Sequence, residues 1–405
     1  MIRFFVNILL KDDPLPRRCG ELLFEEPDAR GRITAAFRYA TAFLVDPAAF
    51  PLDPVSLPLS PEVVQAHLPA PGFGVFEDTL PDDWGRRLLV RKAGLDREHQ
   101  RLPHLLKAIG ASALGALSFL ERDAAEPPPP DADAVLLEVL LAQAEAFERD
   151  ATVSDRDIAA LLRAGSSPGG ARPKALVDTG DNRRWIAKFP RREDRMSVIT
   201  IEAATMRLAA AAGLRVPEIR TLHIAEKPVL LVERFDITPG GGRHHMISMQ
   251  TLLRADQWYH LGYDDLMDVV RRISDHPRED LQQLFRQMVF NAAVGNTDDH
   301  LKNFTMLHDH GGWHLSPAYD LLPDIDGRRE HVLRIDLSNT FSARSALENT
   351  ARRHGIRGAV DIISEVIDAV SNWRQGFSES GVTQDDIEHL SPDIERRLQR
   401  MRMKG

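Results

Sequence analysis

The sequence contains a single cysteine, Cys19, among 405 residues. One thiol excludes an internal disulfide and a cysteine-rich zinc site, and it is typical of proteins that work in a reducing compartment. Long apolar runs are also missing. The first ten residues are mostly apolar but include Asn7, and Glu138 and Arg207 interrupt two later stretches. These runs are too short to span a bilayer, so we expect a cytoplasmic protein with no membrane association.

The chain has no excess of positive charge. It carries 51 Lys and Arg residues against 60 Asp and Glu residues, which gives a formal net charge of −9. A protein that coats nucleic acid needs a basic surface to displace counterions, so that class is excluded as the main function. The hydrophobic content of 43% is that of an ordinary globular protein. The length corresponds to about two or three domains.

A proline run divides the sequence. Pro127 to Pro130 lie between acidic residues, a composition typical of an extended spacer. We therefore predict a small α+β domain over residues 1–125 and a linker over 126–133. Beyond the linker the pattern changes from strand-like to helical, which predicts a small mixed β-sheet lobe over 134–240 and a larger all-helical lobe over 241–405. The predicted fold class is α+β.

Several segments of the two predicted lobes have clear patterns. We expect a hairpin over 175–178 and 185–189, a helix over 201–212, a strand over 228–235, and a helix from Leu281 that ends at Gly295. A cleft between a sheet lobe and a helical lobe is a common place for a nucleotide.

The most informative block, residues 295–304, follows the last of these helices. It contains Asp298 and, five residues later, Asn303. A kinase uses an Asp to orient and deprotonate the attacking hydroxyl, and an Asn at this spacing to hold Mg²⁺. A second hairpin, with strands over 304–307 and 313–316, is expected to bring Asp320 back toward Asn303. Two oxygen ligands, completed by phosphate oxygens, suit Mg²⁺.

The predicted sheet lobe supplies complementary parts. The Gly/Ser-rich turn over 165–174 can present backbone N–H groups to phosphates. Lys188 lies in an apolar strand, where an ammonium needs a partner, and Glu202 on the next helix is expected to be that partner. Such a Lys–Glu pair positions nucleotide phosphates in kinases. The strand end that contains Glu233 and Phe235 is expected to expose backbone groups to adenine.

His300 has two interpretations. Together with His308, His310 or His314 it could ligate zinc, but no cysteine lies near and the spacing matches no familiar zinc site. A structural role, in which the imidazole hydrogen-bonds to the catalytic loop, is favoured.

Taken together, these motifs resemble those of the HipA family of bacterial toxin Ser/Thr kinases. The resemblance is carried by Ser-Ser-Pro-Gly-Gly-Ala-Arg-Pro-Lys (166–174), Trp-Ile-Ala-Lys-Phe (185–189), Glu202 with Met-Arg-Leu-Ala (206–209), Val-Glu-Arg-Phe-Asp (232–236), Asn-Thr-Asp-Asp-His-Leu-Lys-Asn-Phe (296–304) and Leu-Ser-Pro-Ala-Tyr-Asp (315–320). Near the N-terminus, Gly-Glu-Leu (20–22), Phe-Arg-Tyr (37–39) and Leu-Pro-Asp-Asp-Trp-Gly (80–85) are similar to the small domain that precedes the kinase core in this family.

The resemblance implies an ATP- and Mg²⁺-dependent protein kinase with a two-lobed core. It also implies the toxin half of a toxin–antitoxin pair, held in check by a helix-turn-helix antitoxin that binds operator DNA, so that DNA is contacted only through the antitoxin. The implied substrate is a protein, for example a translation component such as an aminoacyl-tRNA synthetase. Growth arrest and persistence are the implied cellular outcomes.

The residue roles follow from the same resemblance. Asp298 matches the catalytic base, Asn303 and Asp320 the metal ligands, and Lys188 the phosphate-binding lysine. The nucleotide site would further include Ser167, Gly169, Gly170, Lys174, Glu202, Glu233, Phe235 and His300.

Self-inactivation is a further implication. Family members phosphorylate a Ser of the phosphate loop in trans, and Ser167, beside Ser166, matches that position. Two residues depart from the family pattern, because Arg172 stands where Gln is usual and Ile237 where an Arg often follows Phe-Asp.

Two alternatives remain open at the level of sequence. A small-molecule kinase that acts on an antibiotic or sugar hydroxyl would show a similar Asp and Asn loop. A non-catalytic subunit that binds a DNA-binding partner is the other alternative, and the presence of Lys188, Asp298, Asn303 and Asp320 counts against it.

Overall fold

The computed structural model describes the chain in two compact units. The first comprises residues 1–187, 233–256 and 307–312, and the second comprises 188–232, 257–306 and 313–405. Within these ranges the described residues are all except 11–12, 14, 69–71, 125–131, 134–136, 150–153, 155–156, 159–160, 162–171, 180–182, 239–240, 256–259, 310, 329, 337–343 and 404–405. Most of the predicted linker and of the Gly/Ser-rich turn therefore lies outside the described residues.

The first unit begins with an antiparallel sheet of strand order β4-β3-β2-β1-β5. Its strands are β1 Ile2–Ile8, β2 Arg17–Phe24, β3 Ile33–Tyr39, β4 Val64–Leu68 and β5 Leu117–Leu120. Alternate side chains of β1, from Phe4 to Ile8, are fully buried, as expected of a strand with one face on the core. The ring of Phe4 packs edge-on against Phe24 and Phe119.

Helices and further strands complete the first unit. The helices are α1 Thr41–Leu44, α2 Gly74–Glu77, α3 Asp83–Lys92, α4 Leu102–Ile109, α5 Leu137–Glu148 and α8 Met249–Leu252, with 3-10 turns at Arg97–His99 and Gly110–Ser112. Three strands, β6 Ala132–Asp133, β7 Lys174–Asp178 and β8 Arg184–Lys188, are neighbours in that order. The adjacent β7 and β8 confirm the hairpin predicted around residues 175–189.

A buried histidine of the first unit makes the stability of the fold depend on pH. His245, in β11 His245–Ser248, is 1% exposed, and its Nε2 donates to the Leu52 carbonyl at 2.8 Å. Burial lowers the pKa of His245 to about 4. Above pH 6.5 the ring is neutral in both the folded and the unfolded chain. Between about pH 6.5 and pH 4 the unfolded chain binds a proton that the folded chain does not, so stability is lost as the pH falls through this window.

We expect this linkage to lower the free energy of unfolding by up to about 3 kcal/mol between pH 6.5 and pH 4. Urea unfolding of the wild type and of His245→Gln at a series of pH values will measure it. The Gln amide keeps a donor for the Leu52 carbonyl but does not titrate, so its profile should be flatter in this window. If the free energy of unfolding of the two proteins changed with pH in parallel, His245 would not be the group responsible.

The second unit starts with a helix and a β-hairpin. Helix α7 Val198–Ala211 is followed by Gly213, at φ 79°, and the antiparallel strands β9 Ile219–Ile224 and β10 Lys227–Glu233 come next. These elements confirm the helix predicted over 201–212 and the strand predicted over 228–235. The inner face of α7 packs Ile199 and Ala203 against Leu230 and Val232 of β10.

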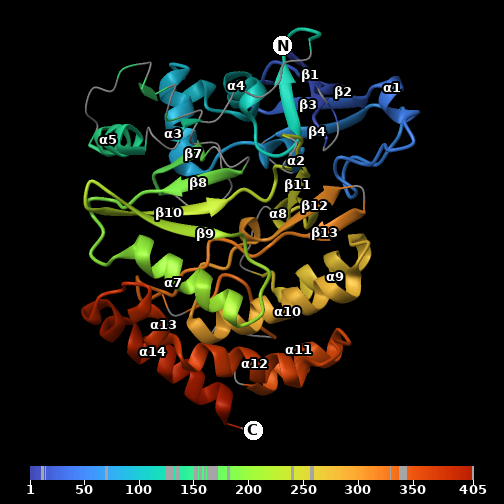
Figure 1. Ribbon diagram of the computed structural model, residues 1–405. Coiled ribbons are helices and arrows are strands. Elements are labelled where there is room, and N and C mark those ends of the chain that lie inside the picture. The colour runs from blue at the N-terminus through green and yellow to red at the C-terminus, as the bar shows by residue number, and fades with distance from the viewer. Residues whose placement is uncertain are drawn as a thin grey trace. The chain divides into compact units, whose positions relative to one another are not determined.

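The rest of the second unit is mainly helical (Figure 1). Helix α10 Pro277–Val294 packs against α9 Tyr263–Ile273, α12 Ala359–Ser371 and α14 Gln384–Arg402, and the remaining helices are α11 Arg344–Arg353 and α13 Trp373–Glu379. After α10 come the 3-10 turn Leu301–Asn303 and the neighbouring strands β12 Thr305–Asp309 and β13 Gly312–Leu315, of which residues 307–312 are counted with the first unit. The end of α10 before Gly295 and the β12–β13 hairpin were both predicted.

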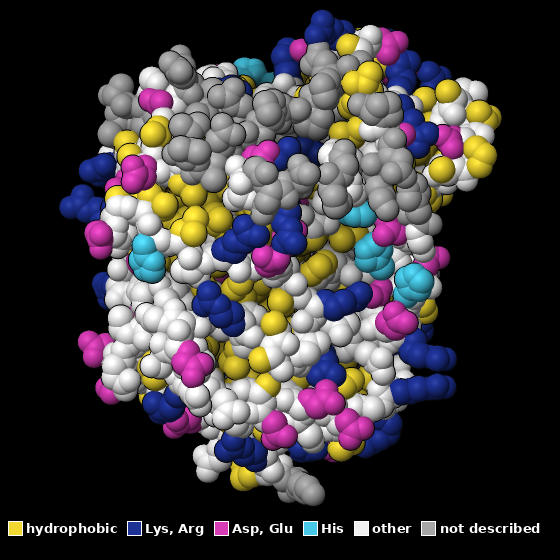
Figure 2. All heavy atoms as spheres, in the orientation of Figure 1, with side chains coloured by type: hydrophobic (Ala, Val, Ile, Leu, Met, Phe, Trp, Pro, Cys, Tyr) yellow, Lys and Arg dark blue, Asp and Glu magenta, His cyan; other side chains and the backbone are white. Residues whose placement is uncertain are grey.

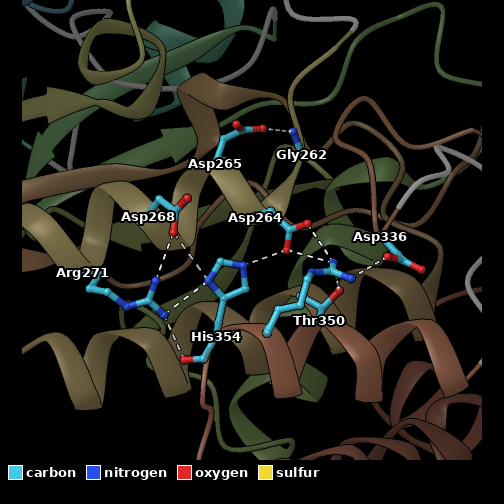
Figure 3. A network of polar contacts seen from close by, with 9 residues as sticks. Gly262, Asp264, Asp265, Asp268, Arg271, Asp336, Thr350 and His354 are labelled. Carbon is cyan, nitrogen blue, oxygen red and sulfur yellow. Dashed lines mark hydrogen bonds and ion pairs between the residues drawn. The ribbon is translucent and has the colours of Figure 1, made fainter.

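A network of charged side chains joins α9 to the C-terminal end of α11 (Figure 3). Arg353 bonds to Asp264 at 2.8 Å and to Asp336 at 2.7 Å, and His354 lies 2.8 Å from Asp264. Arg271 reaches the His354 carbonyl at 2.9 Å. Several charges held in one network stabilise more than isolated surface pairs do, so this cluster fixes α11 against α9.

The surface has mixed charge. On the face shown in Figure 2, acidic and basic side chains are interspersed, in keeping with the sequence charge balance. Among the helices that the structure describes, none combines the length and the hydropathy needed to cross a bilayer.

Candidate active site

The predicted catalytic loop begins where α10 ends. Gly295 closes the helix in the left-handed conformation at φ 79°, and its N–H donates to the Asn291 carbonyl. Most residues avoid this conformation, whereas glycine adopts it without a steric cost. A Cβ at Gly295 would also lie 2.8 Å from Asp393 Oδ2, so a larger residue would crowd the carboxylate of Asp393. The turn directs residues 296–303 away from the helix axis.

Asp298 is presented to solvent from this loop. Its side chain is 59% exposed, and Oδ1 accepts a hydrogen bond from Arg328 at 2.9 Å. Its backbone carbonyl accepts a hydrogen bond from the Asn303 side chain at 2.9 Å. The main chain of Asp298 is therefore held while its carboxylate remains accessible, which is the arrangement that a base acting on an external hydroxyl needs.

Asn303 supplies an oxygen to the same loop. The residue is 5% exposed, and its Nδ2 is used in the bond to Asp298. Its Oδ1 is buried and accepts no hydrogen bond from the described residues. A buried carbonyl oxygen without a donor is unfavourable unless a ligand completes it, and an amide oxygen is a suitable ligand for Mg²⁺. Asn303 thus fits the predicted metal site.

Lys188, Glu202 and Asp320 form a buried charged cluster. The ammonium of Lys188 bonds to Glu202 Oε1 and, at 2.7 Å, to Asp320 Oδ1. Burial alone would lower the pKa of Lys188, but the carboxylates of Asp320 and Glu202 raise it well above its usual value. The side chain therefore stays charged. The predicted pairing of Lys188 with Glu202 is confirmed, and the structure adds Asp320 as a second partner.

Asp320 is tied to the catalytic loop through its neighbour. The hydroxyl of Tyr319 donates to the Lys302 carbonyl at 2.7 Å and also lies 2.7 Å from Thr305 Oγ1. The residues next to Asp320 and Asn303 are thus in contact, as the hairpin predicted. Asp320 itself has a φ of 56°, a conformation that few residues other than glycine, Asn and Asp adopt. Such backbone conformations gather at functional sites.

A second, fully buried cluster lies beneath the loop. Asp299, next to the exposed Asp298, is 1% exposed and accepts hydrogen bonds from Tyr263 at 2.7 Å, His331 at 2.9 Å and the Val332 N–H at 2.9 Å. Arg397 of α14 reaches the other side of the His331 ring at 3.1 Å. Sequence reasoning missed these contacts, because no local pattern connects residues so far apart in the chain.

Other predicted residues belong to the first unit. Lys174 is fully buried and paired with Asp82, the residue that caps α3. Glu233 ends β10 and lies 3.7 Å from Arg183, while Phe235 is half-buried in the following turn. Ser167, Gly169 and Gly170 lie outside the described residues. The nucleotide-binding roles given to these residues stay predictions.

The positions of the histidines bear on the zinc interpretation. His300 is half-buried at the start of the 3-10 turn, and the ring of His308 stacks on Phe50 with 3.6 Å between centroids. In the described parts of the chain, no group of three or more His, Cys, Asp or Glu side chains could hold a metal ion. The zinc interpretation therefore gains no support there. A Mg²⁺ site in which nucleotide phosphates supply some of the oxygen ligands needs fewer protein ligands, so it does not require such a group.

Two family models match this chain. Residues 166–373 match the HipA-like C-terminal domain, and residues 16–120 match the HipA N-terminal domain. A Sinorhizobium fredii protein named as a kinase, Y4mE, is 29% identical over 242 residues, which cover 54% of this chain and 56% of that protein. The serine/threonine-protein kinase toxin HipA of Shewanella oneidensis is 25% identical over 302 residues, 66% of each chain. Each alignment covers less than two thirds of the relative.

A solved structure shares the fold. In the Shewanella oneidensis complex of HipA, HipB and operator DNA, the matching chain has a TM-score of 0.71 at 20% identity, and the match covers 98% of this chain and 96% of that one. The α+β architecture is thus that of a two-lobed, kinase-like protein. The matches to the two HipA domain models show that the chain belongs to the HipA family.

Proposed function

We propose that this protein is an ATP- and Mg²⁺-dependent Ser/Thr protein kinase and the toxin of a toxin–antitoxin pair. The observation that carries the proposal is the buried ammonium of Lys188, bonded to both Glu202 and Asp320. A Lys between a helix Glu and a metal-binding Asp is the arrangement with which kinases position ATP phosphates.

The chemistry follows from the donors and acceptors of these residues. Lys188 has three N–H donors, of which the two carboxylates use two, so one is available to a phosphate oxygen. Asn303 Oδ1 and the Asp320 carboxylate would hold Mg²⁺, which, when bound, neutralises charge on the phosphate oxygens. Asp298 accepts the proton of the attacking hydroxyl. Arg328, which bonds to Asp298 here, must give way to that hydroxyl.

The remaining parts of the proposal concern organisation and regulation. We assign residues 1–125 to an accessory domain, 134–240 to the nucleotide-binding lobe and 241–405 to the lobe with the catalytic motifs. We also propose autophosphorylation at Ser167 or Ser166. The added phosphate would inactivate the enzyme, because its negative charge would repel the triphosphate of ATP. The proposed partner is a helix-turn-helix antitoxin that brings the toxin to DNA, and the lone, buried Cys19 suits a cytoplasmic site of action.

The proposed activity is tested with γ-labelled ATP and a bacterial lysate. Wild-type protein with Mg²⁺ should transfer label to Ser or Thr of a protein, identified by mass spectrometry, and EDTA should prevent the transfer. The Asp298→Asn protein is the control for kinases already present in the lysate. Label found only in small molecules would favour the antibiotic or sugar kinase, and no transfer in any arm would contradict the proposal.

A further inference from the structure

The geometry points to Asp299, His331 and Arg397 as positioning residues, a buried relay through which helix α14 holds the catalytic loop in its active form. This inference rests on the proposed function. None of the three side chains needs to touch the nucleotide or the substrate. Their effect is transmitted through Asp299 to its neighbour Asp298.

Asp299 uses its full capacity as an acceptor. Oδ1 accepts from the backbone N–H groups of Val332 at 2.9 Å and Leu333 at 3.3 Å. Oδ2 accepts from the Tyr263 hydroxyl at 2.7 Å and from His331 Nδ1 at 2.9 Å. A carboxylate offers about four acceptor positions. Four donors from two separate segments therefore fix one side chain of the loop in a single position.

The hydrogen bonds also fix the tautomer of His331. Arginine donates and cannot accept, so His331 Nε2 must accept from Arg397 at 3.1 Å. The hydrogen then lies on Nδ1, where it points to Asp299. Arg397 is itself oriented by Asp393, four residues earlier in α14, at 2.6 Å. The donors and acceptors form one directed chain from α14 to the loop, and all of its members are buried or largely buried.

Three features connect this chain of hydrogen bonds to catalysis and not only to stability. Asp298 and Asp299 are consecutive, and one side chain is 59% exposed while the other is fully buried, so the position of Asp299 sets the direction of Asp298. The segment held by Asp299, residues 331–333, also follows Asp320 by about a dozen residues. α14 additionally packs on Gly295, the first residue of the loop. A displacement of about 1 Å in such a group can lower a rate about a hundredfold.

The second unit contains a matched control for Asp299. Asp280, near the opposite end of α10, is also 1% exposed and accepts from a backbone N–H, a hydroxyl and a cation: Leu315 at 2.7 Å, Ser274 at 2.8 Å and Arg215 at 2.6 Å. Asp280→Asn disturbs a site of the same kind away from the loop. Any loss of activity that comes from general destabilisation should therefore occur in both variants.

The test compares Asp299→Asn with Asp280→Asn in the full-length protein. An Asn amide at position 299 must turn its NH₂ group toward donors, so the loop should loosen. We expect kcat to fall about tenfold or more, the KM for ATP to change by less than about threefold, and hydrogen exchange to rise in the peptide 296–304. Asp280→Asn should lower thermal stability without these effects. Equal losses of kcat in the two variants, in proportion to the folded fraction, would overturn the inference.

Variants of His331 provide the second arm. Asn at position 331 keeps one donor and one acceptor, so His331→Asn should retain more activity than His331→Phe at equal folded fraction. Equal activity of the two would overturn the relay. Hydrogen exchange is measured without ATP, so unchanged exchange in the loop of Asp299→Asn refutes the inference even if the wild type is active. A wild type that binds and transfers nothing refutes the proposed function instead.

Discussion

Replacing Asp298 by Asn is expected to reduce phosphotransfer by about 10²–10⁴-fold, the range over which a positioned base contributes to proton transfer. The change keeps the size of the side chain and the backbone bond from Asn303 to residue 298. Because Asp298 is exposed and bonded only to the exposed Arg328 among the contacts described, folding should not suffer. Affinity for ATP with Mg²⁺ should stay within about threefold of the wild type, because the base acts on the hydroxyl and not on the bound nucleotide.

Single-turnover kinetics and calorimetry separate these effects. Asp326→Asn is the matched control, because Asp326 is an exposed carboxylate that lies 3.5 Å from the same Arg328. This variant should behave as the wild type. Phosphopeptide mapping of residues 160–175 in the same samples tests self-inactivation, since a phosphate on Ser166 or Ser167 should occur only in proteins with an intact base.

A wild-type rate in Asp298→Asn would mean that the base has been assigned wrongly. The neighbouring Asp299 could not replace it, because its side chain is fully buried and accepts four hydrogen bonds. Of the two adjacent carboxylates, Asp298 is therefore the accessible one.

Local patterns predicted the elements that carry the site. The apolar spacing before Gly295 predicted the end of α10, and the alternation after Asn303 predicted the β12–β13 hairpin. The cost of a lone ammonium in an apolar strand predicted the partner of Lys188. In each case the physical cause lies within about fifteen residues of the feature that it explains.

Contacts that depend on tertiary packing were not predictable in this way. Lys188 and Asp320 are separated by 132 residues, and His331 and Arg397 by 66. No spacing rule connects such pairs, and neither a single His in a loop nor a single Arg on an apolar helix face carries a local signal of its partner. Lys174 illustrates the same point, because its burial against Asp82 depends on how α3 and β7 meet within the first unit.

Lys188→Met is expected to abolish nucleotide binding and to destabilise the protein. Removing the ammonium leaves Glu202 and Asp320 without the cation that they share, and their side chains are only 5% and 21% exposed. Breaking a buried pair by removing one partner costs about 3–5 kcal/mol. Loss of one preorganised donor to developing negative charge lowers kcat by about 10²–10³-fold. A single variant cannot tell the two effects apart.

A second substitution separates them. In Lys188→Met/Glu202→Gln the uncompensated charge is reduced, so much of the lost stability should return, measured as the free energy of unfolding in urea. Binding of ATP with Mg²⁺ should not return, because the donor to the phosphates is still missing. Glu202→Gln alone keeps the contact between Lys188 and Asp320 and should retain measurable binding. If the double variant recovered binding together with stability, Lys188 would have only a structural role, and the nucleotide site would have to lie elsewhere.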